Sequence, residues 1–539
     1  MNKPSRPEVI TALTPEQIAE RFRPLDSEKL VGIESYHITL PPKHLSALGA
    51  LAALTAAPTS REIGLYGPSN AANARKETHD DAHQGLYSVF FSRDGHVVAR
   101  FVESRYPELT KATVLASLQH LGKRNNLGIA GDEQEFGKIP HEIRDGAVDP
   151  IAIELTERKD WQWPYYGAVD TTVKNANSIT RIALTEPEFL DQTYVDSDGE
   201  THSVAEGLAA NLSWIKHRMD LNPDGLVEAL SVNPKHHANQ TWADSPDAFH
   251  HADGSWARHH YPEKMWGVAS VELQAEVYDT LLNTADLYEK TGHDHEEIDD
   301  LRGRAARLKK TVFDHFWVED HGLTRVVDGE EIPLGGYFAR GTDHDDDGAL
   351  HPLEIRTSDM GQLLDTRLLD GEEDKVASII GHLFSSEMMS KWGVRTLSTD
   401  SARFFEDRYH GGNTWPWVSY TIAKGLDRHG YHGLARDLKT RIWNLYDTTH
   451  MMPEFAPGSD RPLITNRVLV DDPSLTTETI HPISQPAQEI QAWTAAAIAA
   501  IKIENGLSLD PERIKNKILP QHAIDPKKLQ LEEALLRTQ

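Results

Sequence analysis

Residues 271–288 read VELQAEVYDTLLNTADLY, and this stretch decides the fold class. Its apolar residues recur at intervals of three and four, which is the spacing of one face of an α-helix. Strand-like alternation is sparse and is confined to residues 192–202 and 322–332, each with an Asp-Gly pair at its turn. The helical pattern returns over residues 87–101, 109–121, 204–218, 298–316, 360–369, 375–383, 415–426, 433–446 and 489–503. The sequence therefore predicts a mainly α protein with short β-hairpins in its loops.

The length of the chain sets its domain organisation. At 539 residues it exceeds the usual size of a single hydrophobic core, and 39% of its residues are hydrophobic, so a large core can be buried. No sequence repeat of roughly 20–50 residues is detectable, which argues against a solenoid and favours paired helices that close into a ring. We predict an N-terminal extension or cap over residues 1–60, a helical barrel over 61–505 and a charged helical tail over 506–539.

The charge of the chain restricts its partners. With 83 acidic and 55 basic residues the net charge is −28, which disfavours nucleic acid and anionic membranes and favours a neutral or cationic partner. The absence of cysteine excludes disulfides and thiolate chemistry and fits a reducing cytosol. Residues 1–10 lack the apolar core of a secretory signal, and the apolar run 45–57 is too short to span a bilayer, so we expect a cytoplasmic protein. The oligomeric state is left open.

One loop carries the first candidate for chemistry. Residues 239–254, NQTWADSPDAFHHADG, have no apolar period and precede the helix that begins near residue 271. Trp242 lies two positions before Asp244, and an indole beside a carboxyl offers a face for a sugar and an apolar wall that raises the pKa of the acid. These properties suit a general acid. The alternative is that Asp244 only caps a turn.

A second carboxylate follows about 210 residues later. Glu454 lies between Met, Pro and Phe in the segment MMPEF, residues 451–455, which follows a predicted helix. Glycoside hydrolysis needs two carboxyl groups, one to protonate the leaving oxygen and one to activate water, and they commonly come from distant loops. Asp244 and Glu454 are the candidates for this pair.

The order of these motifs resembles that of the amylo-α-1,6-glucosidase part of glycogen debranching enzymes, a family of (α/α)6-barrel glycoside hydrolases. In that family the acid lies in a Trp-x-Asp loop, here residues 242–244, and the base lies in a Pro-Glu segment, here residues 453–454. The resemblance extends from about residue 84 to 500. Further similar segments are LYSVFFSRDG at 86–95, EFGKIPHEIR at 135–144, PYYGAVDTT at 164–172, YHGGNTWPW at 409–417 and QAW at 491–493.

The resemblance implies an inverting, exo-acting α-glucosidase that acts on glycogen or oligosaccharides, with Asp244 as general acid and Glu454 as general base. The family's loop reads Trp-Lys-Asp-Ser-Trp-Asp where this chain has WADSPD, so Asp247 competes with Asp244 for the role of acid. Two other functions stay open: a trehalase-like or glucosylglycerate-type hydrolase of small glycosides, and an inactive carbohydrate-binding barrel. The residues that the resemblance assigns to substrate binding are Arg93, Asp94, Lys138, His141, Glu142, Tyr166, Asp170, Trp242, His410 and Trp415.

A separate motif predicts a structural metal ion. Residues 343–354, DHDDDGALHPLE, fit the calcium-loop pattern D-x-[DN]-x-[DN]-G-x5-E, in which oxygen ligands surround Ca²⁺ and the glycine permits a sharp bend. An acidic surface loop is the alternative. No cofactor is expected for the chemistry, and the adjacent histidines at 236–237, 250–251 and 259–260 point apart in any regular element, which argues against catalytic zinc. The predicted calcium ligands are Asp343, Asp345, Asp347 and Glu354.

Overall fold

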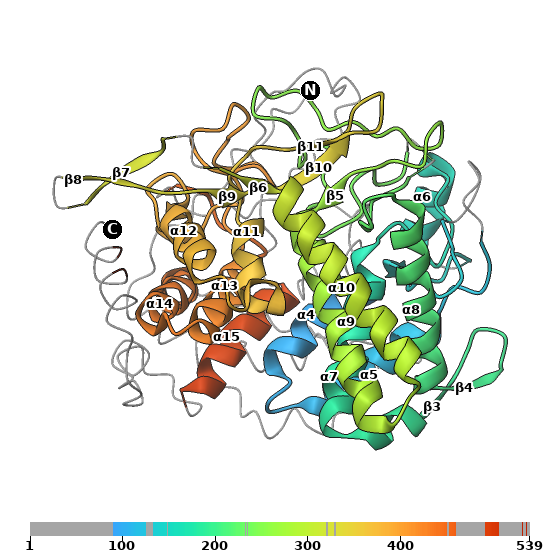
Figure 1. Ribbon diagram of the computed structural model, residues 1–539. Coiled ribbons are helices and arrows are strands. Elements are labelled where there is room, and N and C mark those ends of the chain that lie inside the picture. Colours follow the sequence, from blue (N-terminus) through green and yellow to red (C-terminus); the bar gives the residue numbers. More distant parts are fainter. Residues whose placement is uncertain are drawn as a thin grey trace, which may run out of the picture.

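The computed structural model describes most of the chain from residue 90 to 505. As predicted, the fold is mainly helical with short strands (Figure 1). The predicted extension over residues 1–60 lies outside the described residues, as does the predicted tail over 506–539 except for residues 531 and 535. No helix in the described part of the chain is long and apolar enough to cross a bilayer. The described residues are 90–125, 133–147, 149–231, 233, 235–319, 322–327, 330–449, 452–459, 491–505, 531 and 535.

Six helices contact one another in a closed cycle, in which each packs on the next and the last returns to the first. In order they are α4 (Ser92–Val102), α7 (Asp170–Thr185), α9 (Val271–Thr291), α11 (Asp359–Gln362), α13 (Pro416–Arg428) and α15 (Ala492–Glu504). We call these the inner helices. Because an inner helix has neighbours on several sides, little of its surface reaches water, and in α15 every residue from Ala492 to Lys502 is buried.

A second set of helices packs outside this cycle, one against each of five inner helices. These outer helices are α5 (Pro107–Leu118) on α4, α8 (Val204–Leu221) on α7, α10 (His295–His315) on α9, α12 (Glu373–Leu383) on α11 and α14 (His432–Thr449) on α13. Helix α10 shows the expected amphipathic pattern, since Ile298, Leu301 and Leu308 are buried and most of its polar residues face solvent. Helix α6 (Pro150–Lys159) lies between α5 and α7 along the chain.

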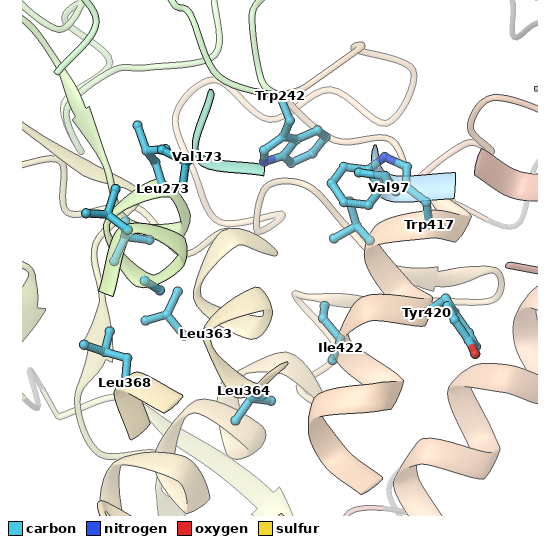
Figure 2. Packing of buried hydrophobic residues seen from close by; sticks show 14 of the residues in the cluster. Val97, Val173, Trp242, Leu273, Leu363, Leu364, Leu368, Trp417, Tyr420 and Ile422 are labelled. Carbon is cyan, nitrogen blue, oxygen red and sulfur yellow. The ribbon is translucent and has the colours of Figure 1, made fainter. Parts of the chain in front are cut away.

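The core lies where the inner helices meet. Side chains from four of them, Val97 of α4, Val173 of α7, Leu273 of α9 and Trp417 of α13, belong to one large cluster of buried residues (Figure 2). This cluster also receives apolar residues from the outer helices, such as Leu308. One continuous core therefore joins both sets of helices.

Nine of the ten predicted helices are present as helices, and the tenth is broken into short turns. Residues 360–369 give only the single turn α11 followed by the 3-10 turns η4 (Leu363–Asp365) and η5 (Arg367–Leu369). The first predicted helix begins later than expected, at Ser92, because Phe90 and Phe91 form strand β1. Helices α6 and α7 were not predicted.

The strands are short and lie in the loops. Both predicted hairpins form, as β3 (Thr193–Val195) with β4 (Thr201–Ser203) and β7 (Thr324–Val327) with β8 (Glu330–Pro333). Three more strand pairs lie among the described residues. They are β1 (Phe90–Phe91) with β2 (Glu142–Ile143), β6 (Trp317–Val318) with β9 (Tyr337–Phe338), and β12 (Met389–Ser390) with β13 (Gly393–Val394). The only sheet of three strands among the described residues orders β11 (Leu350–Pro352), β10 (Gly341–His344) and β5 (Ala269–Ser270). Strands β1 and β5 run directly into the inner helices α4 and α9.

Candidate active site

The first turns of the inner helices converge in pairs. Arg93 of α4 reaches Asp170 of α7, and the ring of Trp417 in α13 stacks on that of Trp493 in α15 at 5.5 Å between centroids. Burial and the nearby carboxylate of Asp359 in α11 raise the pKa of Glu272 in α9. The loops that precede these helices carry the predicted catalytic residues to the same end of the cycle.

Arg93 connects the predicted acid to the inner helices. Its Nε donates to Oδ2 of Asp170 at 2.6 Å, and its Nη1 donates to Oδ2 of Asp244 at 3.0 Å. Arg93 and Asp170 are each 3% exposed, whereas Asp244 is half-buried. A planar guanidinium with donors on two sides fixes the positions of both carboxylates at once.

Asp94, the next residue, locates both predicted catalytic carboxylates. Burial raises the pKa of Asp94 to about 7 against the lowering effect of Arg93, and the carboxylates of Asp244 and Glu454 raise it further. Direct contacts also link the two segments, which lie 210 positions apart in the sequence. The Tyr409 hydroxyl donates to Glu454, and the ring of Tyr409 packs edge-on against that of His410, whose Nδ1 lies 2.9 Å from the hydroxyl of Ser245, the residue after Asp244.

The segment that contains Glu454 is held between the starts of two inner helices. Thr414, just before α13, exchanges both backbone hydrogen bonds with Ala456 at 2.8 Å, and Oγ1 of Thr494 in α15 donates to the carbonyl of Pro453 at 2.7 Å. Glu454 is 4% exposed, and its Oε1 accepts a hydrogen bond from the Tyr409 hydroxyl. The proposed base is thus buried and oriented by a phenol.

Trp242 anchors the acid loop instead of offering a sugar an open face. Its Nε1 donates to Oδ1 of Asp359 at 2.8 Å, and the residue is only 3% exposed. Its ring meets three others edge-on, those of His410, Trp415 and Trp417, at 5.1, 5.7 and 5.3 Å between centroids. The indole is enclosed by packing, so the predicted stacking face is not open to solvent and its effect on Asp244 is positional.

Asp244 and Asp247 lie in different surroundings. Oδ1 of Asp247 accepts from the Ser245 hydroxyl at 2.7 Å, and its Oδ2 lies 3.1 Å from Nε of Arg408. The hydroxyl of Ser245 also lies 2.9 Å from Nδ1 of His410, whose pKa is well below its usual value because of burial and the nearby arginines. Asp247 thus contacts its own loop and Arg408, whereas Asp244 contacts Arg93 at the start of the inner helix α4.

Comparison with known proteins identifies the family. Residues 129–456, more than half of the chain, match the mannosylglycerate hydrolase MGH1-like glycoside hydrolase domain. The chain belongs to this family. It is therefore a glycoside hydrolase, as the motifs predicted, although the family is not that of glycogen debranching enzymes.

Solved structures resemble the MGH1-like domain at low sequence identity. The GH63 mannosylglycerate hydrolase from Thermus thermophilus in complex with Tris has a TM-score of 0.48 at 15% identity, over 82% of this chain and 99% of that one. The same enzyme with Tris and D-glycerate has a TM-score of 0.48 at 16% identity, over 79% of this chain and 96% of that one. No curated protein matches the sequence.

Three of the predicted binding residues of the MGH1-like domain are engaged in contacts within the protein. Lys138 is buried, and its Nζ lies 3.3 Å from Oε1 of Glu135. Glu142 forms an ion pair with Arg144. The hydroxyl of Tyr166 donates to the carbonyl of His120 at 2.8 Å. These contacts hold the three side chains in position, and their role in substrate binding stays a prediction.

The predicted calcium loop forms the turn of a hairpin between β10 and β11. Asp343 is fully buried, and its two oxygens lie 3.0 Å from Nη2 and Nε of Arg258. Oδ1 of Asp345 instead accepts from the backbone of Asp347 and Ala349, both at 2.9 Å.

Gly348, at the sixth position of the motif, has a φ of +91°, and a Cβ there would lie 2.5 Å from the ring of Trp266. A tight turn therefore accounts for this glycine without an ion. The structure does not bring Asp343, Asp345, Asp347 and Glu354 together as one ligand set, so the calcium site of the MGH1-like domain stays a prediction, and these contacts argue against it.

Several residues at the site were not predicted. Tyr409 adjoins His410 in a quoted motif, so its neighbour was a signal that could have found it. Arg340 and Asp359 lie outside any recognised motif. Only the fold brings Asp359 to the indole of Trp242 and Arg340 to Asp359. His237 was set aside as one of a histidine pair, yet its ligand nitrogen lies within 4.8 Å of ligand atoms of His141 and Asp244.

Proposed function

We propose that this protein is an inverting hydrolase of small α-glycosides of the mannosylglycerate or glucosylglycerate type, built on an (α/α)6 barrel. The observation that carries the proposal is the chain of contacts from Glu454 through Tyr409 and His410 to the loop of Asp244, in a chain of the MGH1-like family. The closed cycle of inner helices supports the barrel, since the described part of the chain adds an outer helix to five of the six.

In this mechanism Asp244 donates a proton to the glycosidic oxygen, and Glu454 removes a proton from the water that attacks the anomeric carbon from the opposite face. The two carboxyl groups of an inverting enzyme lie roughly 6.5–9.5 Å apart, which leaves room for that water. Arg93 holds Asp244 in position, and Tyr409 does the same for Glu454. The buried neutral imidazoles of His141 and His410 are suited to hydrogen bonds with sugar hydroxyls.

The family match supports a small substrate over glycogen. The family takes its description from mannosylglycerate hydrolase, an enzyme named for a small glycoside of glycerate. The glucosylglycerate-type alternative, which the sequence left open, therefore fits better than an amylo-α-1,6-glucosidase.

The substrate test compares five glycosides under one set of conditions: mannosylglycerate, glucosylglycerate, trehalose, isomaltose and panose. We expect one of the two glycerate glycosides to have the highest kcat/KM, and NMR to show the inverted anomer as the first sugar product. Fastest turnover of isomaltose or panose would favour the debranching activity. Sugar binding without hydrolysis of any glycoside would establish an inactive binding barrel.

The catalytic assignment is tested by substitution. Asp244→Asn and Glu454→Gln each remove a proton-transfer group while keeping the shape of the side chain, so each should lower kcat by about 10²–10⁴-fold. Asp247→Asn is the matched control, because Asp247 is engaged with Arg408 and Ser245 and should keep most of its activity. A large loss in Asp247→Asn with near-normal turnover in Asp244→Asn would reverse the assignment.

A further inference from the structure

Three side chains at the site have the composition of a metal-binding group. His141, His237 and Asp244 each offer one ligand atom, and these atoms all lie within 4.8 Å of one another. No other group of three or more such residues occurs in the part of the chain that the structure describes. Two imidazoles and one carboxylate form a ligand set that first-row transition metals accept.

The environment of His141 points to a missing partner. The residue is 5% exposed, and its Nδ1 has no hydrogen-bond partner among the described residues. Its ring meets that of His237 edge-on, at 6.0 Å between centroids. A buried ring nitrogen without a hydrogen-bond partner lowers the stability of the protein. A bound ligand that contacts this nitrogen would therefore stabilise the site.

We propose that His141, His237 and Asp244 bind one transition-metal ion of the Zn²⁺ class when no substrate is present, and that this ion inhibits hydrolysis. The inhibition rests on the proposed function, because it requires Asp244 to be the general acid. A carboxylate that coordinates a metal ion cannot hold the proton that the glycosidic oxygen must receive. Metal and sugar therefore compete for the same side chains.

The local charge permits a cation at this place. Nη1 of Arg93 lies 3.0 Å from Oδ2 of Asp244 and opposes a cation, but Nε of the same guanidinium is paired with Asp170 at 2.6 Å. Asp94 and Glu454 add further carboxyl groups close by. The carboxylates of Asp170 and Asp244 thus already outnumber the one guanidinium between them. Because imidazole suits Zn²⁺ better than Mg²⁺ or Ca²⁺, the site should also discriminate between these ions.

Calorimetric titration of the full chain with ZnCl₂ tests the binding. We expect one site, and His237→Gln should weaken it by at least roughly tenfold, the lower limit for disturbing a metal site. The matched control is His293→Gln, since His293 is exposed beyond the last turn of α9 and should leave zinc affinity unchanged. Equal zinc affinity in His237→Gln and the unmodified chain would overturn the proposal. Melting curves of both variants show whether they fold.

Competition on the unmodified chain needs no variant. Zinc inhibition should be competitive with the hydrolysed glycoside, glucose should weaken zinc binding, and MgCl₂ and CaCl₂ should leave the rate unchanged. Non-competitive inhibition, or zinc binding that glucose does not affect, would contradict this inference while the proposed hydrolase stands. Zinc binding at His237 in a chain that hydrolyses none of the five glycosides would support the metal site and refute the function.

Discussion

At the scale of single residues, the hydroxyl of Tyr409 is the contact that prepares Glu454 for its proposed role. It donates to Oε1 of a carboxylate that is 4% exposed. A hydrogen bond to a charged group contributes about 1.5–3 kcal/mol, and it restricts the orientation of that group. The carboxylate of a general base must point at its water, so this orientation matters more for turnover than for folding.

Tyr409→Phe should therefore lower kcat by about 10–100-fold, since each factor of ten corresponds to about 1.4 kcal/mol. The phenylalanine keeps the ring that packs edge-on against Trp415 and Phe455, at 4.9 and 5.4 Å between centroids, so the melting temperature should change little. Steady-state kinetics and a thermal melt check both expectations. An unchanged kcat would show that Tyr409 does not position the base.

The sequence could supply the charged residues of the site but not their contacts. Asp244, Glu454, Arg93 and Asp170 were predicted from short motifs, and the structure brings Asp244 and Glu454 to Asp94 and Arg93 to Asp170. Motifs carry no information on whether an indole is open or enclosed, so the packing of Trp242 was not predictable. The calcium motif alone cannot separate an ion-binding loop from a tight hairpin turn, because both need aspartates and a glycine.

At the scale of elements, fully buried Arg340 ties the loop of Asp244 to the loop of Tyr409 and His410. Its Nη1 donates to the carbonyl of Ala248 at 2.6 Å and to that of His410 at 3.1 Å. Its Nε lies 3.0 Å from Oδ2 of Asp359 at the start of α11. Asp359 in turn accepts from Trp242 in the acid loop. One cation therefore fixes the relative position of three segments.

Arg340→Met should destabilise the protein by about 3–5 kcal/mol, because it leaves Asp359 buried without its partner. The same change should lower kcat, since the loop of Asp244 and the loop of Tyr409, which contacts Glu454, lose a shared anchor. Urea unfolding and steady-state kinetics measure the two effects. In the double variant Arg340→Met/Asp359→Asn the uncompensated charge is gone, so part of the stability should return. No recovery would show that the carbonyl contacts of Arg340 dominate.

The inner helix α7 was missed although its sequence carries the same helical period as the helices that were predicted. Outer helices such as α10 have one apolar face and were found by their period. Helix α7 buries Asn175, Asn177 and Thr180 between its neighbours, and Nδ2 of Asn175 donates to Oδ1 of Asn211 at 2.7 Å in α8. The apolar residues of α7 are nevertheless buried at intervals of three and four, so the helical period was present in the sequence and was missed: Val173, Ala176, Ile179, Ile182 and Ala183.

At the scale of the whole molecule, the acidic excess extends into the interior. The net charge is −28, and several carboxyl groups that lie outside ion pairs are buried in the helical core. Burial raises the pKa of Asp279 in α9 to about 7, although the backbone N–H of Arg367 donates to its Oδ1 at 2.6 Å. The native state favours the protonated form of such a carboxyl group more than the unfolded chain does. The free energy of unfolding therefore depends on pH.

Asp279→Asn tests this linkage away from the active site. The unfolded chain releases the Asp279 proton near pH 3.8, whereas the native state retains it up to about pH 7. Between these values the native state binds more protons, so the free energy of unfolding of the unmodified protein falls as pH rises. Asparagine keeps the acceptor for Arg367 and carries no charge. Urea unfolding should show that the variant is only slightly more stable than the unmodified protein near pH 4. This difference in the free energy of unfolding should grow up to about pH 7 and level off at no more than about 4 kcal/mol, at roughly 1.4 kcal/mol per pKa unit.

Asp299→Asn, the same change on the exposed side of α10, should show no such growth. An advantage of Asp279→Asn that does not vary between pH 4 and 7 would mean that the interior holds this carboxylate charged.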